Sequence, residues 1–227
     1  VEVGTEIFAR HAVKHQKPLI IAVNQLDHEK QDWQATIDSL KATFGNKVVL
    51  VQYPVNPGVE FDTFIDVLKM KMYKFKDENG TRESFEIPED QKEIAQILHQ
   101  QLVEMAAEND ENLMETFFDK GVLSEDEIRA GMKEGMVNGD ILPVFCLSAK
   151  KDIGVKRIME FPINGGITPD ESDILLKDGN EVKVDSNGPT SIFVYKTAQE
   201  QHLGDVSYFK VMSGKLTEGM DLVNPET

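Results

Sequence analysis

Asn24 and Asp27 stand three residues apart in the segment NQLD, directly after the apolar run KPLIIAV. An ionised carboxylate can accept two parallel hydrogen bonds, and guanine presents two adjacent donors, the N1–H and the 2-amino group. Adenine has no such pair of donors, so Asp27 would select guanine, because the wrong base would leave polar groups unpaired. Asn24 could bond the far edge of the base and join this loop to a second one.

A second polar segment, SAK, places Ser148, Ala149 and Lys150 after another apolar run that contains ILPVFC. Ligands of open parallel sheets bind beyond the carboxyl ends of the strands, where both segments would lie. We therefore expect a backbone N–H near Ala149 to meet O6 of guanine. The alternative is ordinary loop chemistry, because Asn and Asp often hydrogen-bond their own backbone.

The elements that would position these segments follow the order helix, buried strand, helix, strand. Residues 5–15 have the apolar spacing of a helix with Thr5 as N-cap, and residues 17–23 are typical of a strand buried on both faces. Residues 29–45 repeat large apolar side chains at helical intervals, and residues 46–55 form another strand. This order predicts a doubly wound α/β sheet.

Residues 56–139 interrupt this order and predict an independently packed α+β insertion. Residues 64–75 alternate apolar side chains with lysine, which is typical of a half-exposed strand, and the segment DENG supplies a turn. Pro88 opens a helix, and Ser124 with Glu127 forms a capping box that opens another. The apolar stripes expected on these two helices are Ile94, Ile97, Leu98, Leu102 and Met105, then Ile128, Met132 and Met136.

The pattern changes twice more along the chain. The run at ILPVFC returns the chain to the parallel sheet as a buried strand. After Gly166, segments of alternating polarity are separated by Gly-rich turns. They predict antiparallel strands that belong to a barrel.

The charge of the chain limits its partners. Its 227 residues include 24 basic and 40 acidic ones, a formal net charge of −16. This charge repels nucleic-acid phosphates at long range, so a contact with RNA must be local and DNA is not an expected partner. The acidic excess lies between residues 77 and 136, either as a solvated surface or as a face for a basic protein.

No segment approaches the roughly 20 apolar residues of a membrane span, and the N-terminus lacks a signal-peptide pattern, so we expect a cytoplasmic protein with no membrane partner. Cys146, the single cysteine, is expected to be a buried core residue rather than a nucleophile. His11 and His15 have a spacing that suits a metal, but without a third ligand solvated histidines are the simpler interpretation.

NQLD resembles the NKxD guanine-specificity motif of GTPases, and SAK resembles their second guanine loop. Residues 1–27 also resemble the segment that follows switch II in translational GTPases. Residues 123–155 are similar to elongation factor G, whose long insert separates it from its smaller relatives, and residues 188–224 resemble the start of that family's barrel domain. The chain is therefore identified as an elongation factor G-like translational GTPase.

This resemblance implies an α/β fold: a partial P-loop GTPase-type parallel sheet with an α+β insert, followed by part of an antiparallel β-barrel. The implied G domain comprises residues 1–54 and 140–166, the insert residues 55–139, and the start of the barrel domain II residues 167–227. No GxxxxGK[ST] phosphate loop and no switch II histidine occurs in the chain. We therefore expect a fragment that begins after switch II and is inactive by itself.

The resemblance also implies a guanine nucleotide as ligand, GTP or GDP, with Mg²⁺ held by residues outside this chain. The residues implied to hold guanine are Asn24, Gln25, Asp27, Ser148, Ala149 and Lys150. No residue of this chain is implied to be catalytic. The whole protein would hydrolyse GTP during ribosomal translocation, and would contact ribosomal RNA and the stalk protein.

Gln25 departs from this family pattern, which has lysine at the corresponding position. Glutamine keeps an aliphatic stem along the nucleotide, but it loses the charge and the hold on the phosphate loop. Two interpretations follow. The protein is either a GTP-hydrolysing translocation factor, or a ribosome-binding paralogue or protection-type factor with weakened or absent GTPase activity.

Overall fold

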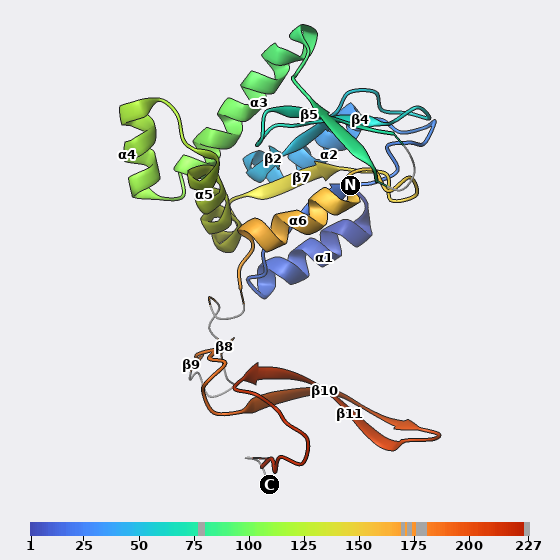
Figure 1. Ribbon diagram of the computed structural model, residues 1–227, viewed down its shortest axis with the longest axis vertical. Coiled ribbons are helices and arrows are strands. Elements are labelled where there is room, and N and C mark those ends of the chain that lie inside the picture. Colours follow the sequence, from blue (N-terminus) through green and yellow to red (C-terminus); the bar gives the residue numbers. More distant parts are fainter. Residues whose placement is uncertain (77–79, 169–170, 172–173, 176–180, 225–227) are drawn as a thin grey trace. The chain divides into compact units, whose positions relative to one another are not determined.

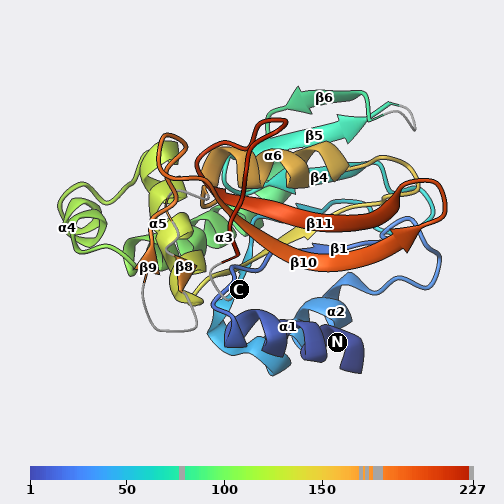
Figure 2. The ribbon, with the colours of Figure 1, turned by 90° about the horizontal axis from the view of Figure 1, so that it is seen from below.

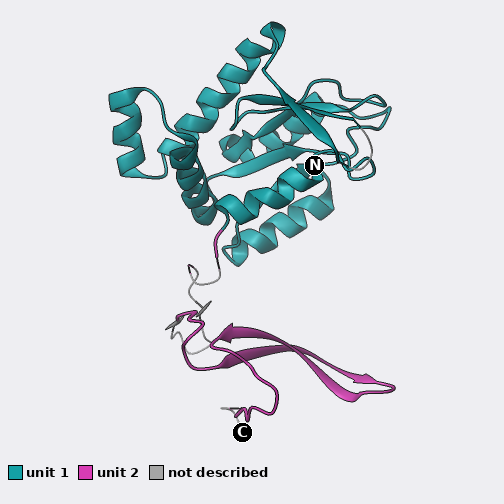
Figure 3. Cartoon of the chain, viewed as in Figure 1, with its two compact units in different colours: residues 1–166 teal, residues 167–227 magenta. Residues whose placement is uncertain are grey.

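The computed structural model describes residues 1–76, 80–168, 171, 174–175 and 181–224. The chain divides into two compact units, residues 1–166 and 167–227, and each is described by itself (Figure 3). Residues 77–79 of the expected DENG turn, and part of the alternating segment after Gly166, lie outside the described residues.

A parallel sheet of three strands organises the first unit (Figure 1). Its order is β1 (Ile21–Val23), β7 (Leu142–Cys146), β2 (Val48–Leu50). All residues of β7 are buried, because this strand has a neighbour on either side and helices over both faces. The predicted parallel α/β sheet is confirmed.

Helices cover both faces of this sheet. α1 (Val3–Lys14) and α2 (Trp33–Phe44) lie on one side, and α6 (Val155–Gly165) lies on the other (Figure 2). Leu40 of α2 is buried with Val144 of β7, whereas Phe145 packs against Phe161 of α6 with ring centroids 4.9 Å apart. Successive residues of β7 therefore face opposite layers, as the period of a strand requires.

The boundaries of α2 follow the sequence closely. The Ala35 N–H donates to the Asp32 side chain at 2.9 Å, which caps the start of the helix. Gly45 ends it with φ +72° and begins the short 3-10 helix η1 (Gly45–Lys47). A residue with a side chain adopts this φ only at a cost, which explains glycine at this position.

Two expectations near the N-terminus are wrong in detail. α1 begins at Val3 after Glu2, and no side chain caps it, so Thr5 is not the N-cap. Of residues 17–23, only Ile21–Val23 form the strand. The Lys17 N–H donates to Ala12 O at 2.8 Å, which keeps the start of this run attached to the end of α1.

A second, antiparallel sheet belongs mainly to the insertion. Its strands, in spatial order, are β3 (Gln52–Pro54), β4 (Thr63–Asp66), β5 (Lys71–Phe75) and β6 (Arg82–Phe85). The predicted single strand over 64–75 is wrong, because the chain turns between β4 and β5 and the two strands pair with each other. In this turn Met70 has φ +50°, and the Lys69 N–H donates to Asp66 Oδ1 at 2.9 Å.

The expected strand over residues 46–55 is likewise divided, since β2 belongs to the parallel sheet and β3 to the antiparallel one. The helices of the insertion are α3 (Glu89–Ala107), α4 (Glu111–Lys120) and α5 (Glu125–Asn138). The capping box of Ser124 and Glu127 is confirmed at the start of α5.

The apolar stripes of these helices are only partly in the core. Leu102 of α3 is fully buried, whereas Ile94 and Ile97 are 49% and 53% exposed, so the prediction for that end of the helix is wrong. Met132 and Met136 of α5 are buried and fill the core, as predicted.

One hydrophobic core joins the insertion to the parallel sheet. Its members come from both parts and include Val49, Leu102, Ile128, Phe145 and Phe161. A buried ion pair crosses the same boundary, because Arg157 Nε of α6 lies 2.7 Å from Asp66 Oδ2 of β4, and the two side chains are 1% and 0% exposed. The expected independent packing of the insertion is therefore wrong.

The second unit contains antiparallel strands. β8 (Ile174–Leu175) pairs with β9 (Glu181–Val182), and β10 (Ser191–Glu200) pairs with β11 (Gly204–Ser213). The predicted antiparallel pairing is confirmed in the described part of this unit. Closure into a barrel stays a prediction.

Candidate nucleotide-binding site

Two loops meet at the carboxyl ends of β1 and β7. The register pairs Val23 with Cys146, and the Leu147 N–H donates to Val23 O at 3.0 Å, so the segments NQLD and SAK leave the sheet side by side. The Ala149 N–H donates to Asn24 Oδ1 at 2.9 Å, and this hydrogen bond ties the loops together. The sequence places the two loops 125 residues apart, and the parallel sheet brings them into contact.

The first loop is anchored through Leu26. Its side chain is buried in a cluster that also contains Phe61, Cys146 and Ile153. The Leu26 N–H donates to Leu147 O at 3.4 Å, so the loop is also attached to the neighbouring strand end. With Leu26 held inward, the neighbouring Gln25 is exposed and Asp27 is half-buried at the surface.

Gln25 and Asp27 differ in how their environment constrains them. Gln25 has φ +62°, a left-handed conformation that few non-glycine residues adopt, and its carbonyl accepts the His28 N–H at 3.0 Å. The Asp27 carboxylate has no hydrogen-bond or ion-pair partner among residues 1–76 and the other described segments. An unpaired carboxylate beside Asn24 fits the two donors on the edge of guanine.

The second loop is a tight turn closed by its own backbone. Ser148 is buried, and its N–H and carbonyl form reciprocal 3.0 Å hydrogen bonds with Ile153. Its Oγ accepts the Lys151 N–H at 3.2 Å. Ala149 and Lys150 are exposed at the tip, so of the predicted site residues in this loop Ser148 is structural and its two neighbours face solvent.

Gly154 connects this loop to α6. It has φ +79°, and a Cβ there would lie 2.5 Å from Cys146 O. Both the backbone conformation and the lack of space require glycine. The helix therefore starts close behind the loop that carries Ala149.

The Ala149 N–H, which is expected to contact O6 of guanine, already donates to Asn24 Oδ1 in this arrangement. A base that approaches the loop has to share this donor with Asn24 or displace it. Three-centre hydrogen bonds of this kind are common in proteins. The contact with O6 stays a prediction.

A third loop contributes to the site, and sequence reasoning missed it. The Gly58 N–H donates to Leu26 O at 2.7 Å, and Lys151 Nζ donates to Val59 O at 2.7 Å. The segment NPG at residues 56–58 signals a turn. That signal says nothing about which other loops the turn contacts.

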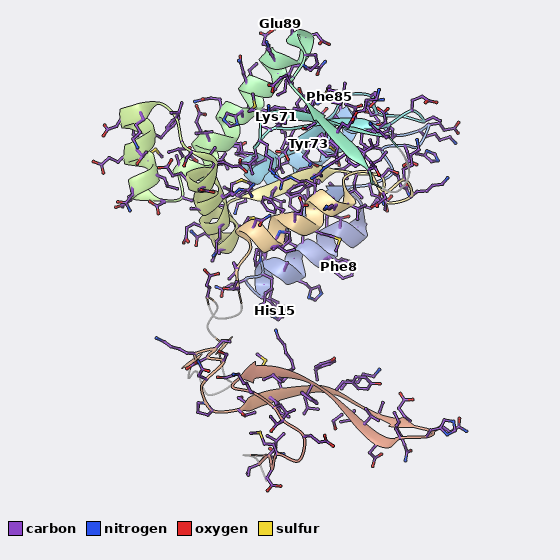
Figure 4. All side chains as sticks on the ribbon, in the orientation of Figure 1. Phe8, His15, Lys71, Tyr73, Phe85 and Glu89 are labelled. Atoms are coloured by element: carbon purple, nitrogen blue, oxygen red, sulfur yellow. The ribbon has the colours of Figure 1, made fainter. Side chains whose placement is uncertain are left out.

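An apolar groove of about 690 Å³ runs along β1, which is an edge strand of the parallel sheet, and reaches Asn24 at one end. Side chains of α1 and α2 line it, among them Phe8, Ala9 and Leu40. Phe8 lies on α1, and the exposed His15 follows the last residue of that helix (Figure 4). The lining is mainly apolar, and its polar side chains are Thr5, Asn24 and Thr36, none of them charged, so the groove itself suits an apolar group better than a nucleotide.

Other candidate groups do not form sites. Within the described segments, no three His, Cys, Asp or Glu side chains come together to hold a metal ion. Burial raises the pKa of the Cys146 thiol well above its ordinary value, which agrees with the prediction of a core residue. None of the helices in the described part of the chain is long and apolar enough to cross a membrane.

No protein-family model matches the chain. A curated protein named elongation factor G-like protein, from Thermotoga maritima, is 31% identical to it over 229 residues, which cover 99% of the chain. The chain is a homologue of this elongation factor G-like protein along almost its whole length. The alignment spans 33% of that relative, so the chain corresponds to about a third of its length.

A solved structure agrees with this elongation factor G-like assignment in fold. A crystal structure of a protein from Thermus thermophilus superposes with a TM-score of 0.79 and 26% identity, over 97% of this chain and 31% of the other. The resemblance read from NQLD, SAK, the insert and the strands after Gly166 is confirmed.

Proposed function

We propose that the chain is the guanine-reading part of a ribosomal translocation factor that binds and hydrolyses GTP during elongation. The observation that carries the proposal is the pair of loops joined by the 2.9 Å hydrogen bond from the Ala149 N–H to Asn24, with the unpaired Asp27 carboxylate beside it. A protein that works on the ribosome would act in the cytoplasm.

Each site residue has a defined task in this proposal. Asp27 accepts the guanine N1–H and 2-amino hydrogens, and Asn24 bonds the opposite edge of the base while holding the second loop. Ala149 supplies a backbone donor near O6. The stems of Gln25 and Lys150 lie along the base, and Ser148 keeps the turn closed through its contacts with Ile153.

GTP or GDP also needs groups that hold its phosphates. Mg²⁺, when bound, would neutralise phosphate charge, and its ligands and the phosphate loop have no counterpart in residues 1–227. Hydrolysis is therefore proposed for the whole protein, and base selection for this chain. No residue described above is assigned a catalytic role.

Calorimetric titration of GDP, GTP and ATP into the complete protein tests this proposal. We expect GDP and GTP to bind and ATP not to bind, since adenine cannot offer Asp27 two donors. The isolated chain should lose most of this affinity, because phosphate contacts are absent from it. Failure of the complete protein to prefer guanine over adenine would overturn the proposal.

A surface on α4 supports a ribosomal protein as partner. An open groove of about 510 Å³ is rimmed by acidic side chains around Met114 and Phe118, and Phe118 is 78% exposed. The acidic residues are Glu108, Asp110, Glu111, Glu115 and Asp119. Such a surface suits a protein partner, for which the resemblance suggests the stalk protein, that presents basic and apolar side chains at the contact, better than ribosomal RNA, whose phosphates it would repel.

Charge reversal tests this surface. Glu115→Lys together with Asp119→Lys should weaken ribosome-stimulated GTP turnover at least about tenfold at low salt, and less at high salt, because rim charges mainly steer association. The matched control is Asp38→Lys, an exposed reversal on α2 away from the groove. Equal effects of the two reversals would argue against a partner at α4.

The alternative function is a ribosome-binding paralogue or protection-type factor with weak or absent turnover. Gln25 favours it, because a lysine at this position would add a charged contact to the phosphate loop. In that case the protein would still use the acidic groove and the barrel domain on the ribosome, while nucleotide would have a smaller role.

A further inference from the structure

We propose that residues 56–62 form a strut that positions both guanine-binding loops, with Phe61 and Lys151 as its positioning residues. The proposal rests on the guanine site described above, and assigns a role to a segment of the insertion that carries no nucleotide motif. The strut lies between β3 and β4, and so belongs to the antiparallel sheet rather than to the parallel one.

The strut holds the first loop at the residue that precedes Asp27. The Gly58 N–H donates to Leu26 O at 2.7 Å, and that carbonyl belongs to the peptide group that links Leu26 to Asp27. Phe61 is fully buried in the same cluster as Leu26. The backbone at Asp27 is thus fixed by the hydrogen bond from Gly58 and by the packing of Leu26 and Phe61 in one buried cluster.

The strut holds the second loop through a charged donor. Lys151 Nζ donates to Val59 O at 2.7 Å, and Lys151 directly follows Lys150 at the tip of SAK. Ile153, which closes the turn at Ser148, is buried in the cluster that contains Phe61. The strut therefore contacts both loops, and the hydrogen bond between Ala149 and Asn24 joins the same two loops directly.

The strut is itself rigid. Asn56 Nδ2 donates to Glu60 O at 2.8 Å, and Asn56 Oδ1 accepts the Thr63 N–H at 3.0 Å. The Phe61 N–H donates to Gly58 O at 2.8 Å, which closes a turn inside the segment. Because its two ends continue into paired strands, a shift of the antiparallel sheet would be transmitted to both guanine loops.

The consequence is specific to base recognition. Asp27 can accept two donors only when its carboxylate lies in the plane and at the distance that the base requires, and small misplacements are costly. Residues 56–62 contain no phosphate-loop motif, so phosphate contacts would come from segments other than the strut. Loosening the strut should therefore reduce the preference for guanine more than it reduces nucleotide binding in general.

The test compares GDP with IDP in the complete protein, at equal Mg²⁺. Hypoxanthine, the base of IDP, keeps the N1–H and O6 but lacks the 2-amino group, so its binding depends on one donor to Asp27 instead of two. The wild type should bind GDP more tightly than IDP by about tenfold or more, because IDP lacks one charge-assisted hydrogen bond to Asp27. The measured quantity is the ratio of the two affinities for each variant.

Two variants weaken the strut. Lys151→Met, which removes the bond to Val59 O while keeping most of the stem, should lower the GDP to IDP ratio by about threefold. Phe61→Leu, which loosens the packing under both loops, should lower it by about threefold to tenfold. Neither variant removes a residue that is proposed to touch the base.

Each variant has a matched control. Lys156→Met removes a lysine of α6 that faces Glu160 on the same helix at 4.0 Å, and should leave the ratio unchanged. Phe161→Leu removes a buried aromatic ring of α6 that belongs to the main hydrophobic core rather than to the cluster of Leu26 and Phe61, and should lower the melting temperature without changing the ratio.

The outcomes separate the strut from the guanine site. A wild-type preference for GDP that falls in Lys151→Met and Phe61→Leu, but not in the controls, supports the strut. If both strut variants keep the wild-type preference for GDP, or if Phe161→Leu loses it to the same extent, the strut proposal is overturned and the guanine site stays intact. A wild type without preference between GDP and IDP overturns the guanine site itself.

Discussion

Asp27 owes its proposed role to its neighbours, because the carboxylate makes no contact of its own among the described residues. Leu26 is buried before it, and Asn24 is tied to the second loop, so the backbone on that side is fixed while the carboxylate stays available. A polar side chain held in place without a partner is ready to bind a ligand at little ordering cost.

Gln25→Lys tests the residue that departs from the family pattern. If glutamine weakens the site, lysine should raise GTP affinity and turnover of the complete protein by about threefold to tenfold, because a charged donor is restored. Fluorescence titration and single-turnover hydrolysis measure the two effects. An unchanged affinity and rate would remove the support that Gln25 gives to the paralogue with weakened activity.

The pair of Asp66 and Arg157 is predicted to be the most sensitive charged contact in the first unit. Both side chains are buried, and Arg157 Nη1 and Nη2 have no hydrogen-bond partner within the described residues. Asp66→Asn should lower the free energy of unfolding by about 3–5 kcal/mol, because it leaves a buried cation without its counter-charge. Urea denaturation measures the change.

An exposed pair supplies the control for this prediction. Glu89→Gln breaks the pair with Lys92, in which the side chains are half or more exposed, and should cost less than about 1 kcal/mol. Equal losses in Asp66→Asn and Glu89→Gln would contradict the importance of burial.

At the scale of elements, the sequence best predicted those helix boundaries that are determined by capping residues close to them in the chain. Asp32 and Gly45 define α2, and Ser124 with Glu127 starts α5, because caps act within a few residues. The pattern failed over 64–75, where alternation of apolar and basic residues continues through a turn. It also failed for Ile94 and Ile97, because helical spacing defines a face but not whether another element covers it.

The capping box of α5 predicts a specific pH dependence. The Ser124 Oγ and N–H both donate to Glu127 Oε2 at 2.7 Å, and these bonds lower the pKa of Glu127 below its ordinary value of 4.5. Because the folded pKa is depressed, the stabilisation is complete above the unfolded pKa and is lost as pH falls through the folded pKa.

Ser124→Ala removes the side-chain donor, so the pKa of Glu127 should rise toward its ordinary value. Carboxyl-detected NMR titration of the wild type and the variant measures this shift. The same low pKa in both proteins would mean that Ser124 does not hold the Glu127 carboxylate.

At the scale of the whole molecule, the sequence predicted that NQLD and SAK meet at one edge of the sheet, but not which segments support them. NQLD and SAK are short motifs at strand ends, and a parallel sheet brings such ends together. The strut at residues 56–62, the shared core and the ion pair of Asp66 with Arg157 depend on contacts between distant segments. Single-sequence patterns carry no information on which distant segments meet.

The two units of the chain differ in the kind of packing that they contain. The first unit combines a parallel sheet with an insertion that shares its core, and a separate buried cluster joins Phe61 of the insertion to Leu26 and Ile153 beside the two loops. The second unit offers antiparallel strands whose outer residues are largely exposed. Its proposed role on the ribosome follows from the resemblance of residues 188–224 to the start of the barrel domain.

The most direct test of the central claim is the base preference of Asp27→Asn in the complete protein. Xanthine carries an oxygen in place of the 2-amino group, so it presents a donor and an acceptor, which an Asn side chain can match and Asp cannot. Asp38→Asn, on exposed α2, serves as the control.

We predict that calorimetry will show GDP binding at least about 100-fold weaker in Asp27→Asn, with XDP bound more tightly than GDP. Asp38→Asn should keep the wild-type order. An Asp27→Asn protein that binds GDP as the wild type does, and gains no affinity for XDP, would contradict the claim that this carboxylate reads guanine.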